Sequence, residues 1–342
     1  MSSLQSARGG NRAPKTQHKA WITLVVTGLV LGAAFIAVYV GLQRSPEPLH
    51  LPIAIAGEQL ASAAEHDLGG KAAVTEVPSL AEGAKLVRDG DAVAAAGLSA
   101  PTTLQVDYAG AKGLSESAAA RGLLQGVADH AGLTVSEQDL VPLVKYDGRG
   151  LSAFYVVFGV TLSSFVLAQG LTAAAGKIRL RHRLYAIGGF AVVIGLVAAT
   201  IAGPLLGALT APWPALALTL SLMSAAVAFT TKALGAWLGG PGISLAVLSL
   251  TTVGNAVSGA TIGYDILPSW AQAISAVLPP GAAYRAVNHF GYYNGSTAWS
   301  SLVVLAIWAA AGFGLVLLRP ATRARKTRSI PAQPEPATVS VA

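Results

Sequence analysis

Apolar residues in this chain gather into six long runs that polar segments separate. Each run holds about 20 residues or more, the length that a helix needs to cross the hydrocarbon core of a bilayer. The runs predict six membrane-spanning helices, at residues 20–42, 151–173, 185–209, 213–231, 242–263 and 298–318. The first run follows a polar segment and has no A-x-A site at its end, so we interpret it as an uncleaved anchor.

Residues 43–150 have a different pattern, with short apolar runs and 14 of the 16 acids. "LPIAIAG", "AAVTEV", "AVAAAGL" and "TLQVDYAG" read as strands, although the alanine run at residues 92–96 fits a helix or a strand. Residues 58–67, 79–89 and 114–131 read as helices. About 108 residues can bury a modest core. We therefore expect a small α/β extracytoplasmic domain inserted between the first and second spans.

Composition agrees with a membrane protein, because 53% of the residues are hydrophobic and only 11% are charged, against roughly a quarter charged in ordinary domains. The chain has no cysteine, which removes disulfides, thiol catalysis and cysteine-ligated zinc. His50, His66 and His130 lack metal-ligand spacing, so we expect ordinary surface histidines and no metal or cofactor.

Basic residues mark the cytoplasmic side of short loops. Fourteen of the 23 bases fall in the tail 1–19, the loop 174–184, the turn 232–241 and the tail 319–342, against one acid, Glu335. Both termini are therefore predicted to be cytoplasmic, in a multi-pass protein of a bacterial plasma membrane. The positive charge then reflects topology and contact with anionic membrane lipids, and we expect no nucleic acid partner. The tail 319–342 ends in a Pro-rich stretch and is predicted to be disordered.

None of the six expected spans contains Asp, Glu, Lys, Arg or His, which argues against an ion-coupled carrier. The most polar mid-span group is Asn255, for which an inter-helix hydrogen bond is the favoured interpretation. "GLTAAAGKI" at 170–178 has one residue too many between its glycines, and Ile178 stands where a phosphate loop has Ser or Thr. A G-x-S-x-G elbow is absent as well. We expect no enzyme activity, and energy for any transport must come from another subunit.

Three stretches resemble a known family. They are "GRGLSAFYVVFGV" at 148–160, "GNAVSG" at 254–259, and "LPSWAQAISAVLPPGAAYRAVNHFGYYNG" at 267–295. With the order of one span, a large outer domain and five more spans, they resemble the membrane subunits of ABC-2 type exporters, in the branch of actinobacterial permease-like proteins similar to phage infection proteins. Ala256 departs from the proline expected after the asparagine, so a local break in the fifth span is an open question.

The resemblance implies three sets of site residues. Residues 264–297 would fold back as short re-entrant helices at the outer surface, where Arg285 and His289 could contact lipid phosphate or an anionic substrate group; interfacial anchoring alone is the alternative. The first inner loop, 174–184, would dock an ATPase or only contact lipid. In full, the sets are the docking loop Lys177, Arg179, Arg181 and Arg183, the outer loop Pro279, Pro280, Tyr284, Arg285 and His289, and the span-five motif Gly254, Asn255, Ser258 and Gly259.

The leading hypothesis is therefore a permease subunit of an ABC-2 type exporter that moves an amphipathic or hydrophobic compound outward. Its expected partners are a separate ATP-binding subunit and a second permease, in a homodimer or heterodimer. The alternative is a non-transporting scaffold or surface receptor of the phage-receptor or secretion-accessory type, in which the outer domain is the functional part.

Overall fold

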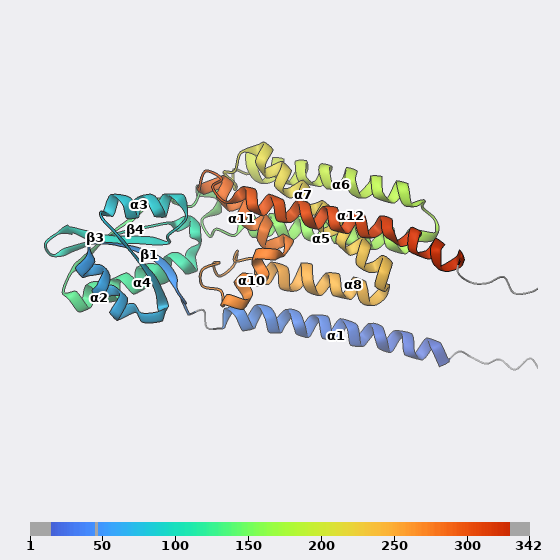
Figure 1. Ribbon diagram of the computed structural model, residues 1–342, viewed down its shortest axis with the longest axis horizontal. Coiled ribbons are helices and arrows are strands. Elements are labelled where there is room, and N and C mark those ends of the chain that lie inside the picture. The colour runs from blue at the N-terminus through green and yellow to red at the C-terminus, as the bar shows by residue number, and fades with distance from the viewer. Residues whose placement is uncertain (1–14, 45–46, 329–342) are drawn as a thin grey trace, which may run out of the picture.

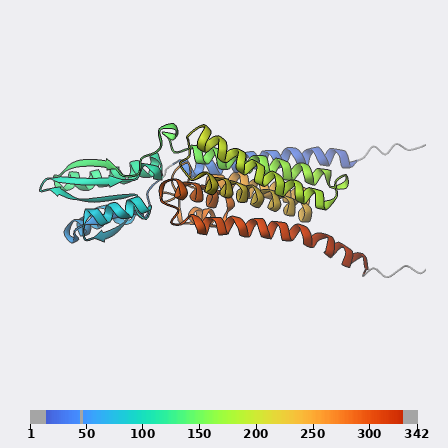
Figure 2. The ribbon, with the colours of Figure 1, turned by 90° about the horizontal axis from the view of Figure 1, so that it is seen from above.

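The molecule is elongated, with an α/β domain at one end and a bundle of long helices at the other (Figure 1). This computed structural model describes residues 15–44 and 47–328. The tails expected at 1–19 and 319–342 lie mostly outside these ranges. Both described ends of the chain lie at the end of the bundle away from the α/β domain (Figure 2). We call this the far end, and the opposite end of the bundle the domain end.

Five helices among the described residues are long and apolar enough to cross a membrane. They are α1 (Lys15–Gln43), α5 (Ser152–Ala173), α6 (Leu180–Thr200), α7 (Trp213–Leu238) and α12 (Ala298–Arg328). The chain is thus mainly helical, with the long apolar helices of a membrane protein, as its apolar runs predict. The helix α12 continues to Arg328, past the expected start of the tail at residue 319.

The sixth expected span, 242–263, is not among these helices. It is divided into α8 (Gly240–Ala246), the π-helical stretch η6 (Val247–Val253) and α9 (Gly254–Ala256), followed by turns. A π-helical stretch widens the helix and disturbs its regular hydrogen bonds. The break therefore forms without the proline that Ala256 replaces.

The bundle packs around α7, because 67% of its most apolar window is buried, whereas none of the α1 window is. Glycines on the neighbouring helices permit this close packing. A Cβ atom at Gly195 of α6 would overlap Ser221, and one at Gly312 of α12 would lie 2.7 Å from the Thr230 nitrogen. By contrast, α1 lies along one side of the bundle beside η6 and α9.

The α/β domain contains a five-stranded sheet in the order β2-β1-β3-β4-β5. Only the β3–β4 pair is antiparallel. The strands are β1 (Leu51–Ala56), β2 (Ala72–Val77), β3 (Ala94–Ala100), β4 (Thr103–Tyr108) and β5 (Thr134–Asp139). The helices α2 (Glu58–Leu68) and α4 (Leu114–Ala131) pack on one face, and α3 (Leu80–Asp89) packs on the other. The alanine run at 92–96 leads into a strand rather than a helix.

Small residues set the spacing between α3 and the sheet. A Cβ atom at Gly83 would lie only 2.9 Å from that of Ala95, so the helix backbone rests almost directly on β3. The strand β5 was absent from the sequence prediction, because "TVSEQD" is polar and forms an edge of the sheet with most of its side chains exposed. Hydrophobic alternation does not reveal a strand of this kind.

Candidate functional site

Two short helices form a hairpin at the domain end, within the expected re-entrant segment. They are α10 (Ser269–Val277) and α11 (Pro279–Tyr292), with only Leu278 between them. Pro268 directly precedes α10, and Pro279 with Pro280 begins α11. Proline suits the first turn of a helix, where its missing N–H group has no intrahelical partner to lose. The prolines thus fix where each helix of the hairpin begins.

Arg285 holds this hairpin together. Its guanidinium group donates to Ser275 Oγ at 2.9 Å, to the Ser275 carbonyl at 3.1 Å and to the Ala276 carbonyl at 3.2 Å. These carbonyls belong to the last turn of α10, where a helix leaves its acceptors unpaired and where the helix dipole favours a cation. The sequence left two roles open for Arg285, contact with lipid phosphate or an anionic substrate group, and interfacial anchoring. In the structure, its guanidinium donors bond inside the protein, where they cap α10.

His289 is also directed inward. Its Nδ1 lies 2.8 Å from Thr297 Oγ1, and its ring centroid lies 5.2 Å from that of Tyr293. Burial, together with the positive charges of Lys112 and Arg285, lowers the pKa of His289 to about 4. The imidazole is therefore neutral near pH 7.

The "GNAVSG" motif ends the broken fifth segment. Asn255 Nδ2 donates to the Leu250 and Thr251 carbonyls at 3.2 and 3.1 Å, so its bonds lie within its own helical segment and not between helices as expected. Ser258 Oγ donates to the Asn255 carbonyl at 2.7 Å. Gly254 permits close contact with α11, because a Cβ atom there would lie 2.8 Å from Pro280 Cγ. The helical segment thus ends at this motif, where Gly254 packs against the hairpin.

The turn after this motif receives a carboxyl group from the α/β domain. Glu116, in the first turn of α4, is 1% exposed, and its Oε1 accepts the Asp265 N–H at 2.6 Å. Gly263 lies beside it with a φ of 93°, and any side chain there would overlap the Glu116 carboxyl group. Lys112 Nζ donates to Asp265 Oδ2 at 3.1 Å. These side chains join the two parts of the molecule, and we call Lys112, Glu116 and Asp265 the junction cluster.

Burial and neighbouring charges change the pKa values of Lys112 and Glu116 in the junction cluster. Burial, reinforced by the nearby negative charge of Asp265, raises the pKa of Glu116 to about 8. Burial alone would lower the pKa of Lys112, but the charges of Asp265 and Glu116 outweigh it, so the pKa of Lys112 is raised. The cluster therefore holds an ammonium–carboxylate pair next to a carboxyl group that keeps its proton near neutral pH.

A cavity of about 60 Å³ adjoins the junction cluster. It is lined by Lys112, Glu116, Gly259, Tyr264, Asp265, Tyr284, Arg285, Asn288, His289 and Tyr293. Since a water molecule takes about 30 Å³ in the liquid, this space suits a few water molecules rather than an organic substrate. Of the expected outer-loop residues, Tyr284, Arg285 and His289 meet here.

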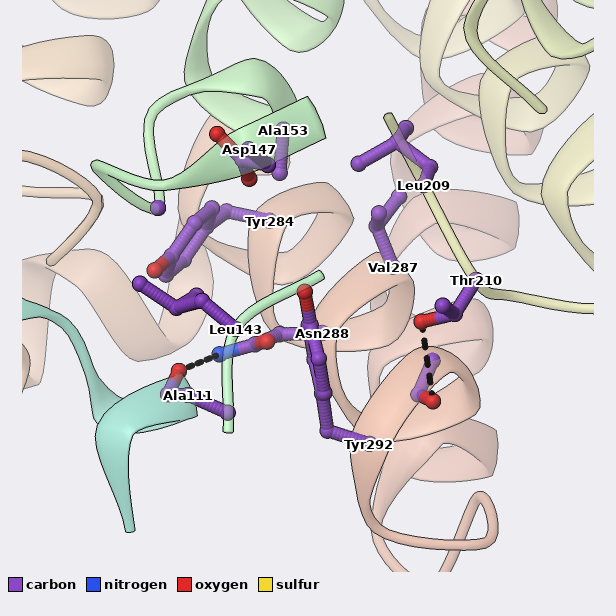
Figure 3. Close-up of a pocket in the computed structure, with 12 residues that line it drawn as sticks. Ala111, Leu143, Asp147, Ala153, Leu209, Thr210, Tyr284, Val287, Asn288 and Tyr292 are labelled. Atoms are coloured by element: carbon purple, nitrogen blue, oxygen red, sulfur yellow. Dashed lines mark hydrogen bonds between the residues drawn. The ribbon is translucent and has the colours of Figure 1, made fainter. Parts of the chain in front are cut away.

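The other side of α11 fastens the hairpin to its neighbours, as Figure 3 shows. Asn288 Nδ2 donates to the Ala111 carbonyl of the α/β domain at 3.4 Å, and Thr210 Oγ1, from the α6–α7 connection, donates to the Gly291 carbonyl at 3.0 Å. Asp147 Oδ1 accepts the Leu151 and Ser152 N–H groups at 3.0 Å each, at the start of α5. The hairpin is therefore bonded both to the α/β domain and to the bundle.

The expected docking loop lies at the far end, where Lys177 and Arg179 connect α5 to α6 and where Arg181 and Arg183 lie in the first turn of α6. Lys177, Arg179 and Arg181 are exposed, whereas Arg183 is turned partly inward. Lys232, which we assigned to a turn, lies inside α7 instead and is only 2% exposed. The bundle thus buries an ionisable side chain that the expected span boundary at residue 231 had excluded. Neither Lys232 nor the junction cluster was predicted, because their significance depends on packing between distant segments.

No protein-family profile, no curated protein and no solved structure matches the chain.

Proposed function

We propose that this chain is the permease subunit of an ABC-2 type exporter, with the α/β domain outside the membrane and both tails in the cytoplasm. The observation that carries the proposal is the α10–α11 hairpin, two helices too short to span, at the end of the bundle that meets the α/β domain. This is the arrangement that the resemblance implies for the segment before the last span.

The path of the chain supports six crossings. Five long helices alone would leave the two chain ends on opposite sides, yet both lie at the far end. The segment α8–η6–α9 leads from the end of α7 to the hairpin, so it supplies the missing crossing. Its 17 residues rise about 25 Å at 1.5 Å per residue, close to the hydrocarbon thickness of about 30 Å.

The distribution of charge supports the orientation. Lys177, Arg179 and Arg181 are exposed at the far end, and the described residues beyond Asp147 contain a single acid, Asp265, which lies at the domain end. Excess basic residues in short loops favour the cytoplasmic side. The far end is then the surface available to a cytoplasmic ATPase, which must supply the energy for outward transport of an amphipathic compound.

Co-purification tests this function directly. The chain would be tagged at its C-terminus, extracted from its native membrane in mild detergent, and analysed by mass spectrometry for an ATP-binding subunit. We expect a stoichiometric ATPase, which the variant K177E/R179E/R181E loses because reversed charges repel an acidic docking surface.

The matched control is K71E/K85E/R88E, which reverses three exposed cations of the α/β domain and should retain the ATPase. If the wild-type chain brings no ATPase, or if the far-end variant binds it as well as the control does, the docking proposal is wrong. Recovery of a secretion or surface partner instead would favour the scaffold.

A further inference from the structure

Lys232 is a buried cation whose hydrogen-bond partners are neutral. Its Nζ donates to the Leu171 carbonyl at 3.1 Å and to Thr172 Oγ1 at 3.3 Å, both on α5. Neutral oxygens satisfy hydrogen bonds, but they do not compensate the charge of a lysine that is only 2% exposed. A buried ammonium group of this kind ordinarily lies near an anion.

Two more cations lie near Lys232. Arg183 from α6 and Arg319 from α12 are both close enough to act on it electrostatically. The Nε atom of Arg183 is buried and has no hydrogen-bond partner among the described residues. Side chains from three helices thus bring positive charge to one place at the far end, and at least one buried donor there is unused.

No carboxylate of the described residues lies beside Lys232 or Arg183 at the far end. Within residues 148–328 the sequence has one acid, Asp265, and its carboxylate bonds Lys112 at the domain end. The remaining described acids belong to the α/β domain and to the segments that join it to α1 and α5. The described part of the chain therefore supplies no counter-charge for Lys232.

We propose that Lys232 and Arg183 bind a phosphate group at the far end of the bundle. An arginine fork and a lysine point charge are the usual protein ligands of phosphate. Lys232 precedes the end of α7 by six residues, which places it about 9 Å along the helix, within reach of the headgroup layer. Two sources could supply a phosphate group at the far end: the headgroup of an anionic phospholipid and free inorganic phosphate. The inference requires the membrane placement but not the ATPase.

Purified full-length chain in phosphate-free detergent tests the site. Phosphatidylglycerol, phosphatidylcholine and inorganic phosphate would be titrated separately, with the thermal unfolding midpoint and lipid adducts in native mass spectrometry as readouts. We expect phosphatidylglycerol, inorganic phosphate or both to raise the midpoint. A response to phosphatidylglycerol alone identifies a headgroup site, and a comparable response to inorganic phosphate identifies a free-anion site.

The variants K232M and R183Q should each weaken this response about tenfold or more, since each removes a charge-assisted hydrogen bond. The control R181Q removes an exposed cation two residues from Arg183 and should bind like the wild type. Size-exclusion profiles and circular dichroism check that each variant is folded, and R183Q serves alone if K232M is not. A wild-type chain that responds to no phosphate source, or folded variants that respond equally, would overturn the proposal.

Discussion

The two ends of the bundle bury lysines in opposite ways. At the domain end, Lys112 is paired with Asp265 at 3.1 Å, next to the buried Glu116. At the far end, Lys232 has only neutral partners, with further cations close by. The junction cluster contains its own counter-charge and responds to pH. The cations around Lys232 depend on an anion that the described chain does not supply. Burial of a charge therefore stabilises an internal contact in one place and creates a binding site in the other.

The largest expected effect comes from breaking the pair at the domain end. Asp265→Ala leaves Lys112 with its main partner gone, which should lower the free energy of unfolding by about 3 kcal/mol. Denaturant titration in detergent measures this loss. The control is Glu137→Ala, whose ion pair with Arg121 is more than a third exposed and should contribute no more than about 0.5 kcal/mol. Equal losses for the two variants would contradict a junction held by charge.

The second expected effect is a dependence of the junction on pH. The pKa of Glu116 rises from 4.5 to about 8 in the folded protein, so the folded state binds an extra proton and loses stability as pH rises from 4.5 towards 8. The pKa of His289 falls from 6.5 to about 4, so the folded state also loses stability as pH falls from 6.5 to 4. Stability should therefore be greatest near pH 5 to 6.

The contributions of these two groups separate between pH 6.5 and 8, because the His289 imidazole is mostly neutral there in the folded and the unfolded state. Across it the wild-type chain should lose at most about 2 kcal/mol, measured by thermal unfolding at each pH. The substitution Glu116→Gln keeps a neutral acceptor for the Asp265 N–H and should remove this loss. Without the opposing contribution of Glu116, the variant should also show a decline in stability as pH falls below 6.5, which is due to His289. An unchanged slope in Glu116→Gln would assign the pH response to another group.

The smallest expected effect compares the same substitution in the two clusters. In phosphate-free detergent, Lys232→Met should change stability by less than about 1 kcal/mol, because removing an uncompensated buried charge offsets the two lost hydrogen bonds. Lys112→Met should instead destabilise the chain by about 2 kcal/mol, since it leaves Asp265 without its cation. A larger loss for Lys232→Met, measured by denaturant titration, would mean that its charge is already compensated within the chain.

Sequence patterns predicted the elements that rest on long or regular apolar runs. The five uninterrupted long helices, three helices of the α/β domain and the four apolar strands follow from them, and the prolines at 279 and 280 marked the start of α11. The edge strand β5 was not predicted, because its residues are polar. The break in the fifth segment was left open because Ala256 stands where a proline was expected, and the π-helical stretch that forms the break has no signature in hydropathy.

The functional residues were harder to predict, because their roles depend on partners far away in the chain. In the sequence, Glu116 looks like an ordinary surface residue of α4. It is buried because the turn at Gly263, far away in the chain, packs against its carboxyl group. Lys232 was assigned to a turn after the fourth span, although α7 continues to Leu238. Arg285 stood out in an otherwise apolar stretch, yet its inward direction follows from the fold of the hairpin.

The cap that Arg285 places on α10 has a consequence for biosynthesis. A nine-residue helix is too short to be stable alone, and its last carbonyls bond a side chain that lies eight residues beyond Val277. The chain leaves the ribosome from its N-terminus onwards, so α10 emerges before its cap exists. The hairpin therefore becomes stable only as a pair, after α11 has been synthesised and has closed back onto α10.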